Sequence, residues 1–383
     1  MRVVALDGSP AAVGVLVDAL REALDGGPAV LPIAPGAAAP ATVPEAPTGT
    51  AVAIATSGST GEPKLVALSA AALRASATAT ATRLGGPARW LLALPAEHVA
   101  GVQVIIRALL AGAEPVVQDL RAGFRTVDFT TATEGLGSEL RHTSLVPTQL
   151  GRILDEGGRA VEALRGYAAV LVGGAALPPA LHDRATAAGV RVVTTYGMSE
   201  TAGGCVYDGV PLDGVTVDLD ADGRIRLGGP TVATGYLGQP AETSAAFVDG
   251  RFVTGDLGRW RDGRLEVLGR ADDVIITGGE KVAPAAVERV LAAQPDVEAV
   301  CVVGLPDPEW GQIVAAAVVR GSTTDADWIE PLRTAVRAEL GRAAVPRRWQ
   351  AIAALPVRGI GKPDRAAVMR LVSKPDGDRH HIG

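Results

Sequence analysis

Short apolar runs alternate with alanine- and leucine-rich stretches along most of the chain, and this alternation limits the fold more than any other feature. The clearest runs lie at residues 51–55, 168–172 and 190–194. Apolar segments of this length, separated by helical stretches, are typical of buried strands. The sequence therefore predicts an α/β fold. The stretch 27–49, dense in Pro, Ala and Gly, shows neither period and is predicted to be a loop.

The length of 383 residues exceeds what one hydrophobic core usually holds, so we expect two domains. The character of the chain changes near Gly269, where a charged segment precedes a strand-like run at 274–276. Beyond it, Pro284 is suited to the first turn of a helix with apolar residues along one face. A strand at 299–303 and a second amphipathic helix around 329–340 follow. We predict a large N-terminal domain over residues 1–270 and a small α+β C-terminal domain over 271–383.

Composition excludes several classes of protein. The formal net charge is −6 and no long basic run occurs, so we expect no nucleic-acid partner. Cys205 and Cys301 stand far apart, which argues against a disulfide framework and a zinc ribbon. The N-terminus does not resemble a signal peptide, and no apolar run approaches the roughly 20 residues that span a bilayer. We expect a cytoplasmic protein without membrane insertion.

A loop rich in Gly, Ser and Thr follows the first predicted strand of the α/β pattern and ends in a lysine. It reads Thr56-Ser57-Gly58-Ser59-Thr60-Gly61-Glu62-Pro63-Lys64. Glycines allow backbone N–H groups to turn inward, hydroxyls add donors, and Lys64 adds a positive charge, all of which suit phosphate oxygens. The spacing differs from that of a Walker A loop. The alternative is an ordinary exposed turn.

This loop resembles the signature loop of the adenylate-forming superfamily, which includes acyl-CoA synthetases, luciferases and peptide-synthetase adenylation domains. Further segments resemble that superfamily's motifs in the same order, and they lie at residues 173–176, 196–201, 254–256, 269–273 with 278–281, and 356–362. Together the motifs span most of the chain. The resemblance implies a large adenylate-forming N-terminal domain, a mobile C-terminal domain, and ATP, Mg²⁺ and coenzyme A as reactants or cofactors.

The chemistry of carboxylate activation gives these motifs roles. Attack of a carboxylate on the α-phosphate of ATP needs positioning and positive charge more than an enzymic nucleophile. Glu200 suits a magnesium ion, Asp256 suits the ribose hydroxyls, and Tyr196 offers a face to adenine. Core packing for Tyr196 and a turn for Asp256 are the structural alternatives. The predicted ATP- or AMP-binding residues are Thr56, Ser57, Gly58, Ser59, Thr60, Lys64, Gly174, Ala175, Tyr196, Gly197, Met198, Ser199, Thr201, Asp256 and Arg270.

The C-terminal motifs carry the catalytic residues that the resemblance implies. Lys362 is similar to the lysine that bridges the acyl carboxylate and phosphate oxygens during adenylate formation, although a lysine on a loop is ordinarily a surface residue. Asp272 matches the superfamily's hinge, about which the C-terminal domain rotates before thioester formation. The CoA-facing loop would then contain Gly278, Gly279 and Lys281. An ordinary glycine hairpin is the alternative for that loop.

The segment from Ser144 to Arg152 resembles o-succinylbenzoate:CoA ligases of menaquinone biosynthesis. The resemblance implies that Arg152 faces the substrate's aromatic carboxylate, which does not react, and a guanidinium suits this role; a solvated helix face is the alternative. Ser144, Gly173 and His98 complete the predicted substrate pocket. Lys362, Glu200 and His98 are the predicted catalytic residues, although packing against the aromatic substrate is the safer interpretation of His98.

The sequence thus predicts an ATP-dependent o-succinylbenzoate:CoA ligase that forms an acyl-AMP intermediate and releases AMP and pyrophosphate. Another aryl- or acyl-CoA ligase of the superfamily is the first alternative. A non-catalytic nucleotide-binding relative is the second, and the presence of Lys362, Glu200 and Asp256 speaks against it. The expected partners are small-molecule substrates, and we allow for a homodimer.

Overall fold

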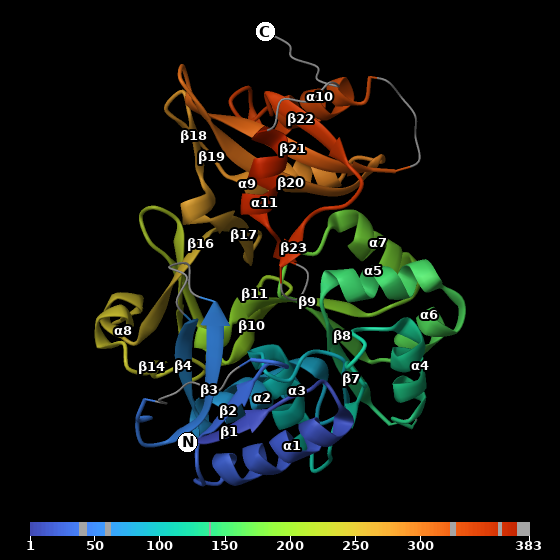
Figure 1. The fold of residues 1–383 in the computed structure, drawn as a ribbon, viewed down its shortest axis with the longest axis vertical. Helices are drawn as coiled ribbons and strands as arrows, with labels where there is room; N and C mark the ends of the chain where they lie inside the picture. Colours follow the sequence, from blue (N-terminus) through green and yellow to red (C-terminus); the bar gives the residue numbers. More distant parts are fainter. Residues whose placement is uncertain (38–43, 58–62, 138, 322–326, 359–361, 374–383) are drawn as a thin grey trace.

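The computed structural model describes residues 1–37, 44–57, 63–137, 139–321, 327–358 and 362–373. Figure 1 shows the C-terminal sheet and its helices stacked on the N-terminal sheets along the longest axis of the molecule. The predicted α/β fold, with a large N-terminal region and a smaller α+β C-terminal region, is confirmed. Among the described residues, none of the helices has the length and apolar character to span a membrane.

The first N-terminal sheet has the strand order β1-β2-β3-β4-β14. Its strands are β1 (Arg2–Ala5), β2 (Val30–Ile33), β3 (Thr50–Ser57), β4 (Pro63–Ser69) and β14 (Gly235–Tyr236). The predicted strand at 51–55 is the interior of β3, whose residues 51–54 are all buried. β3 and β4 are antiparallel and form the hairpin that carries the predicted phosphate loop.

The second sheet, in the order β11-β10-β9-β8-β7-β5-β6, forms the middle of the N-terminal region. Its strands are β5 (Arg89–Leu92), β6 (Val116–Val117), β7 (Arg141–Leu145), β8 (Ala169–Val172), β9 (Val192–Met198), β10 (Gly203–Tyr207) and β11 (Val210–Pro211). β5 to β9 pair in parallel and β10 returns antiparallel. The strands predicted at 168–172 and 190–194 are β8 and the first half of β9.

Helices cover both faces of this second sheet. They are α2 (Ala70–Leu84) and α3 (Val99–Leu110) on one face, and α4 (Thr126–Glu134), α5 (Pro147–Glu156), α6 (Gly158–Arg165) and α7 (Pro179–Ala187) on the other. α1 (Pro10–Leu24) packs against the first sheet and against α3. Within β5, Trp90 and Leu92 join the first core and Leu91 joins the second. Burial on both faces explains why the central strand β8, Ala-Val-Leu-Val, is continuously apolar.

A third, antiparallel sheet leads to the C-terminal region. It contains β12 (Thr216–Leu219), β13 (Arg224–Gly228), β15 (Phe247–Val248), β16 (Arg251–Arg261) and β17 (Arg264–Arg270), and α8 (Pro240–Ala246) precedes β15. The short helix η2 (Ala271–Asp273) then connects β17 to the C-terminal sheet, which begins with β18 (Ile275–Thr277).

The C-terminal sheet has the order β19-β18-β21-β20, with β22 beside β21. Its further strands are β19 (Glu280–Val282), β20 (Val297–Asp307), β21 (Gly311–Arg320) and β22 (Arg348–Ile352). The C-terminal region also contains α9 (Pro284–Ala292), α10 (Ile329–Leu340), α11 (Arg365–Ser373), and the strands β23 (Val357–Arg358) and β24 (Lys362–Pro363), which form a separate two-stranded sheet. The apolar stripes predicted for α9 and α10 are confirmed, because Val287, Val290, Leu291 and Val336 are buried in one core.

The prediction of a loop over residues 27–49 was wrong in part, because β2 lies within it. Val30 and Leu31 are fully buried, and β2 pairs in parallel with β1 on one side and with β3 on the other. Pro32 lacks a backbone N–H, and a strand of four residues is too short to show a period. β2 therefore depends on its neighbours more than on local preference.

Candidate active site

The predicted phosphate loop closes the β3–β4 hairpin. Thr56 pairs with Lys64 across the hairpin, and the Thr56 hydroxyl donates to the Lys64 carbonyl over 3.4 Å. Gly58, Ser59 and Thr60 lie outside the described residues, as does the side chain of Ser57. The structure therefore locates the base of the loop, and the contacts of its tip with phosphate remain a prediction.

Tyr236 joins the lysine of this hairpin to the predicted magnesium ligand. The Lys64 ammonium lies 4.7 Å from the centroid of the Tyr236 ring, and the Tyr236 hydroxyl donates to Glu200 Oε1 over 2.9 Å. Burial and the nearby Glu200 carboxylate raise the pKa of Tyr236, so the phenol stays a donor at neutral pH. Sequence reasoning missed Tyr236, because a lone tyrosine in a short strand has no signal that distinguishes it from a core residue.

Glu200 lies in a tight turn, η1 (Ser199–Thr201), that directly follows β9. The buried hydroxyl of Thr201 accepts from the Met198 N–H at 3.0 Å and lies 2.9 Å from the carbonyl oxygen of Gly203. Thr201 thus holds the turn that presents Glu200. A Cβ atom on Gly197 would lie 2.2 Å from the Gly203 carbonyl oxygen, so only glycine fits there.

Tyr196 and Asp256, the predicted adenine and ribose contacts, are direct neighbours. The Tyr196 hydroxyl donates to Asp256 Oδ2 over 2.8 Å. Burial and the Asp256 carboxylate raise the pKa of Tyr196. Asp256 lies opposite Arg270 in the β16–β17 ladder, and its Oδ1 is 3.9 Å from Arg270 Nη1. The bond between Tyr196 in β9 and Asp256 in β16 therefore joins the second sheet to the third. The Asp256 side chain is only 17% exposed.

The glycine loop after β8 lies against the strand that carries Tyr196. A Cβ atom on Gly173 would be 2.2 Å from the Thr195 hydroxyl oxygen, so the loop can approach β9 closely only with glycine at this position. Gly174 has a φ of +79° and, like Ala175, is exposed. The loop is therefore next to Tyr196 in the structure, while its contact with a nucleotide remains a prediction.

The predicted substrate residues come from separate elements. Ser144 is buried near the end of β7, and the Gly173 N–H donates to the carbonyl of the adjacent Leu145 at 3.2 Å. His98 is the exposed N-cap residue of α3 and makes no side-chain capping bond, and Arg152 is exposed on α5. Within the described part of the chain, no polar contact joins these three side chains. A shared pocket for them remains a prediction.

The two C-terminal motifs occupy different places along the molecule. In Figure 1, β23 lies toward the N-terminal sheets along the longest axis, while β18 and β19 lie farther from them. β23 pairs with β24 at Arg358 and Lys362; the side chain of Lys362 is outside what the structure describes. Gly278 and Gly279 form the turn between β18 and β19 with φ of +56° and +85°, and Lys281 is exposed.

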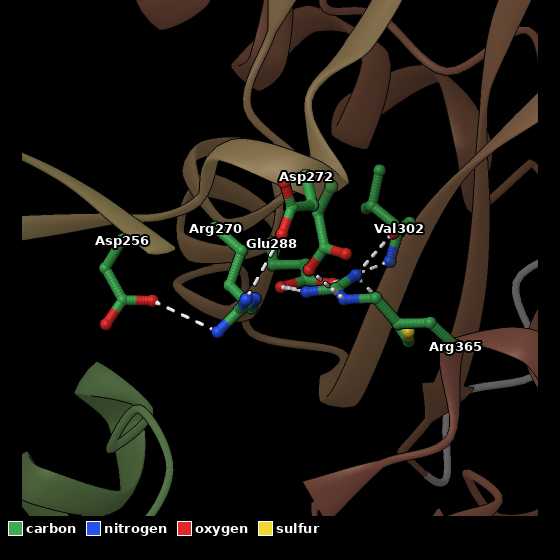
Figure 2. A network of polar contacts seen from close by, with 8 residues as sticks. Asp256, Arg270, Asp272, Glu288, Val302 and Arg365 are labelled. Atoms are coloured by element: carbon green, nitrogen blue, oxygen red, sulfur yellow. Dashed lines mark hydrogen bonds and ion pairs between the residues drawn. The ribbon is translucent and has the colours of Figure 1, made fainter. Parts of the chain in front are cut away.

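The predicted hinge residue, Asp272, is exposed in η2 and forms an ion pair with the last residue of β17. Its Oδ2 atom is 3.2 Å from Arg270 Nη2, and Arg270 also approaches Asp256. Figure 2 shows this series of contacts from Asp256 through Arg270 to Asp272. The hinge segment is therefore next to the predicted ribose site.

A magnesium ion fits Glu200 only if the substrate supplies further ligands. Among the described residues, no group of three or more His, Cys, Asp and Glu side chains could hold a metal. Mg²⁺ commonly binds through one or two carboxylates and completes its octahedron with waters and substrate phosphates. Glu200 has one carboxylate oxygen that Tyr236 does not engage, and it lies near Lys64 of the phosphate-loop hairpin. This donor set is compatible with a magnesium–nucleotide complex.

The fold and the arrangement of these motifs define an adenylate-forming enzyme. Residues 4–237 match the family model for AMP-binding enzymes, and residues 286–362 match the model for the AMP-binding enzyme C-terminal domain. The chain therefore belongs to the AMP-binding enzyme family.

Proteins related in sequence point to one type of enzyme within this family. A probable 2-succinylbenzoate--CoA ligase from Mycobacterium tuberculosis is 48% identical over 311 residues, which cover 80% of this chain and 81% of the relative. The 2-succinylbenzoate--CoA ligase of Salmonella typhimurium is 34% identical, and the match covers 74% of this chain but 60% of that protein. The chain is thus similar to 2-succinylbenzoate--CoA ligases over most of its length.

Solved structures give the same class. The o-succinylbenzoate CoA synthetase (MenE) from Bacillus subtilis, in complex with its acyl-adenylate intermediate, is 28% identical with a TM-score of 0.73, and the match covers 92% of this chain and 76% of that one. The amide bond synthetase McbA from Marinactinospora thermotolerans is 29% identical with a TM-score of 0.77, covering 95% and 79%. The predicted class of enzyme is confirmed.

Proposed function

We propose that the chain is an AMP-forming 2-succinylbenzoate:CoA ligase that acts in menaquinone biosynthesis. The observation that carries the chemistry is that two hydrogen-bonded pairs, Tyr236 with Glu200 and Tyr196 with Asp256, lie at the carboxyl end of β9, the first of them next to Lys64 of the β3–β4 hairpin. The 48% identity to a probable 2-succinylbenzoate--CoA ligase supports the choice of acid.

In the first half-reaction, an oxygen of the substrate's aliphatic carboxylate attacks the α-phosphorus of ATP. The bond from that phosphorus to the bridging oxygen of the β-phosphate breaks, pyrophosphate leaves, and an acyl-AMP remains. Lys64 and Lys362 would supply positive charge to the phosphate oxygens, which is the main requirement of this transfer. Glu200 would hold Mg²⁺, which when bound offsets further charge on the phosphates.

Tyr196 and Asp256 would position the nucleotide. The Tyr196 hydroxyl uses one acceptor site of the Asp256 carboxylate, at Oδ2. The remaining acceptor sites of this carboxylate can receive hydrogen bonds from the ribose hydroxyls. The Tyr196 ring would then offer a face to adenine, fixed by its hydroxyl. Holding ATP at its ribose and base leaves the α-phosphorus in a set place, which lowers the entropic part of the barrier.

In the second half-reaction, the thiol of coenzyme A gives its proton to solvent and its sulfur attacks the acyl carbon. The bond from the acyl carbon to the AMP oxygen breaks, giving the thioester and AMP. We infer that residues 271–383 rotate about Asp272 between the two steps and bring Gly278, Gly279 and Lys281 to the adenylate. Arg152 would hold the substrate carboxylate that does not react, beside Ser144, Gly173 and His98. Use of ATP and coenzyme A fits a cytoplasmic enzyme, and a homodimer is a further expectation.

The test is product analysis by mass spectrometry after incubation of the purified chain with ATP, Mg²⁺, coenzyme A and o-succinylbenzoate. Benzoate and a medium-chain fatty acid serve as parallel substrates. The expected products are o-succinylbenzoyl-CoA and AMP, with little thioester from the other acids. If only another acid gives a thioester, the chain is a CoA ligase but o-succinylbenzoate is not its substrate. Absence of AMP with every acid would favour a non-catalytic nucleotide-binding protein.

A further inference from the structure

Arg365 is the first residue of α11 and lies three positions after Lys362. Its guanidinium forms two parallel bonds with Glu288 of α9, at 2.7 and 3.0 Å, and donates to the carbonyl of Val302 in β20 at 2.6 Å. Figure 2 shows this group enclosed by its partners. Such bidentate, charge-assisted pairs are among the strongest and most directional polar contacts in proteins. The start of α11 is therefore fixed to two other elements of the C-terminal region.

The same guanidinium also reaches the hinge segment. Arg365 Nε is 3.1 Å from Asp273 Oδ2, and Asp273 is the residue after Asp272 in η2. The side chains of Arg365, Glu288 and Asp273 are 29%, 20% and 32% exposed, so water screens these contacts only in part. Burial alone would lower the pKa of Arg365, but the bonds to Glu288 raise it above its usual value. One charged group thus connects η2, α9, β20 and α11.

Apolar packing and the arginine act on different parts of α11. Val368 and Val372 are buried against β20 and β21, and they hold the body of the helix on the sheet. The end that adjoins β24 has polar anchors, because Arg365 binds Glu288 and the Asp364 carboxylate accepts from the Ala367 N–H at 3.0 Å. β24 begins with Lys362 and is followed closely by α11. These polar contacts therefore fix the position of the backbone at Lys362.

We propose that Arg365 is a positioning residue for Lys362, because it locks the β24–α11 junction to Glu288 and to Asp273 in the hinge segment. The inference rests on the proposed function, in which Lys362 serves adenylate formation. A displacement of about 1 Å in a charge-bearing group can cost on the order of 100-fold in rate. Arg365 touches no reacting atom and acts only through the place that it gives to the lysine.

The test measures the two half-reactions separately in Arg365→Gln. Adenylate formation is followed as pyrophosphate release from ATP and o-succinylbenzoate without coenzyme A, and thioester formation is followed from supplied acyl-AMP. We expect kcat of adenylate formation to fall roughly 10- to 100-fold, with KM for ATP within about 3-fold and thioester formation largely kept. Arg370→Gln, on an exposed position of the same helix, is the matched control and should behave as the parent chain. Equal losses in both half-reactions would overturn the proposal.

A double-mutant cycle separates positioning from a general loss of stability. If Arg365 acts through the lysine, Arg365→Gln should add less than about 2-fold to the adenylation defect of Lys362→Ala. If Arg365→Gln slows adenylate formation in Lys362→Ala as strongly as it does in the parent chain, the proposal is wrong. Should Arg365→Gln fail to fold, Asp273→Asn keeps the Glu288 pair and should still slow adenylate formation about 3- to 10-fold; an unchanged rate would count against the hinge contact. If Lys362→Ala itself leaves adenylate formation intact, the proposed role of the lysine fails, which is a different result from failure of Arg365 alone.

Discussion

The hydroxyl of Tyr236 in β14 donates to the carboxylate of Glu200 in the η1 turn over 2.9 Å, although the two residues lie 36 positions apart. The ring of Tyr236 also meets the Lys64 ammonium at 4.7 Å. A residue that no sequence motif pointed to therefore orients the predicted magnesium ligand and borders the phosphate-loop lysine. Outer partners of this kind commonly set the orientation of metal-binding carboxylates.

Replacement of Tyr236 by Phe removes this hydroxyl and keeps the ring. A hydrogen bond to a charged carboxylate contributes about 1.5–3 kcal/mol, so we expect adenylate formation to slow roughly 10- to 100-fold, with a higher Mg²⁺ concentration needed for half-maximal rate. Initial rates over a magnesium titration measure both quantities. Tyr167→Phe is the matched control, because the Tyr167 hydroxyl bonds Thr133 at 2.8 Å in a core of the second sheet. If Tyr236→Phe needs the same Mg²⁺ concentration as the parent chain, Tyr236 does not orient Glu200 for the metal.

Asp256→Asn should weaken nucleotide binding. Hydrogen bonds to a charged group contribute about 1.5–3 kcal/mol, which corresponds to roughly 10- to 100-fold in the Kd for AMP. Isothermal titration calorimetry with AMP measures this change directly. Asp272→Asn removes the other carboxylate that contacts Arg270 and should leave the Kd for AMP within about 2-fold. Equal weakening by the two variants would assign the effect to Arg270 and not to the ribose contact.

Arg152→Ala should change the choice of acid more than the use of ATP. Loss of a guanidinium–carboxylate pair of about 1.5–3 kcal/mol corresponds to a fall in kcat/KM for o-succinylbenzoate of roughly 10- to 100-fold. The kcat/KM for a monocarboxylate analogue and the KM for ATP should stay close to those of the parent chain. Arg159→Ala, an exposed arginine on the adjacent α6, is the control. If the preference for the dicarboxylate survives, Arg152 does not hold the second carboxylate.

His142 should make stability depend on pH. It is 1% exposed, and burial, together with the charge of Arg107, lowers its pKa from 6.5 to about 4. Between these values the unfolded chain binds more protons than the folded one, so the contribution of neutral His142 is present above pH 6.5 and is lost as pH falls toward 4. The full difference corresponds to about 3 kcal/mol.

Urea unfolding at pH 7.5 and pH 5.0 measures this effect. The parent chain should lose stability on acidification, and His142→Gln should lose less, because the amide does not titrate. His182→Gln, at a half-buried position on α7 with 44% of the side chain exposed, is the control and should keep the parent pH dependence. The same pH dependence in His142→Gln and the parent would show that other groups cause it.

Local sequence determined the parts of this protein in which neighbours along the chain carry the information. The buried run of β3, the stripe Val287, Val290 and Leu291 in α9, and the glycine turn at Gly278 follow from periodicity and from backbone freedom. The ordered motifs likewise indicated the family, because each is a short contiguous segment. β2 was missed, since its four residues become a strand only between β1 and β3.

Only the tertiary structure decided which of these segments meet. Tyr236 reaches Glu200, Tyr196 reaches Asp256 and Arg365 reaches Asp273, across 36, 60 and 92 positions of the chain. Such contacts arise where helices, turns and strands that are distant in the chain pack together, and their geometry depends on the register and burial of whole elements. A single sequence specifies the residues that are able to form these bonds, and the packing of the elements selects the partners that they bind.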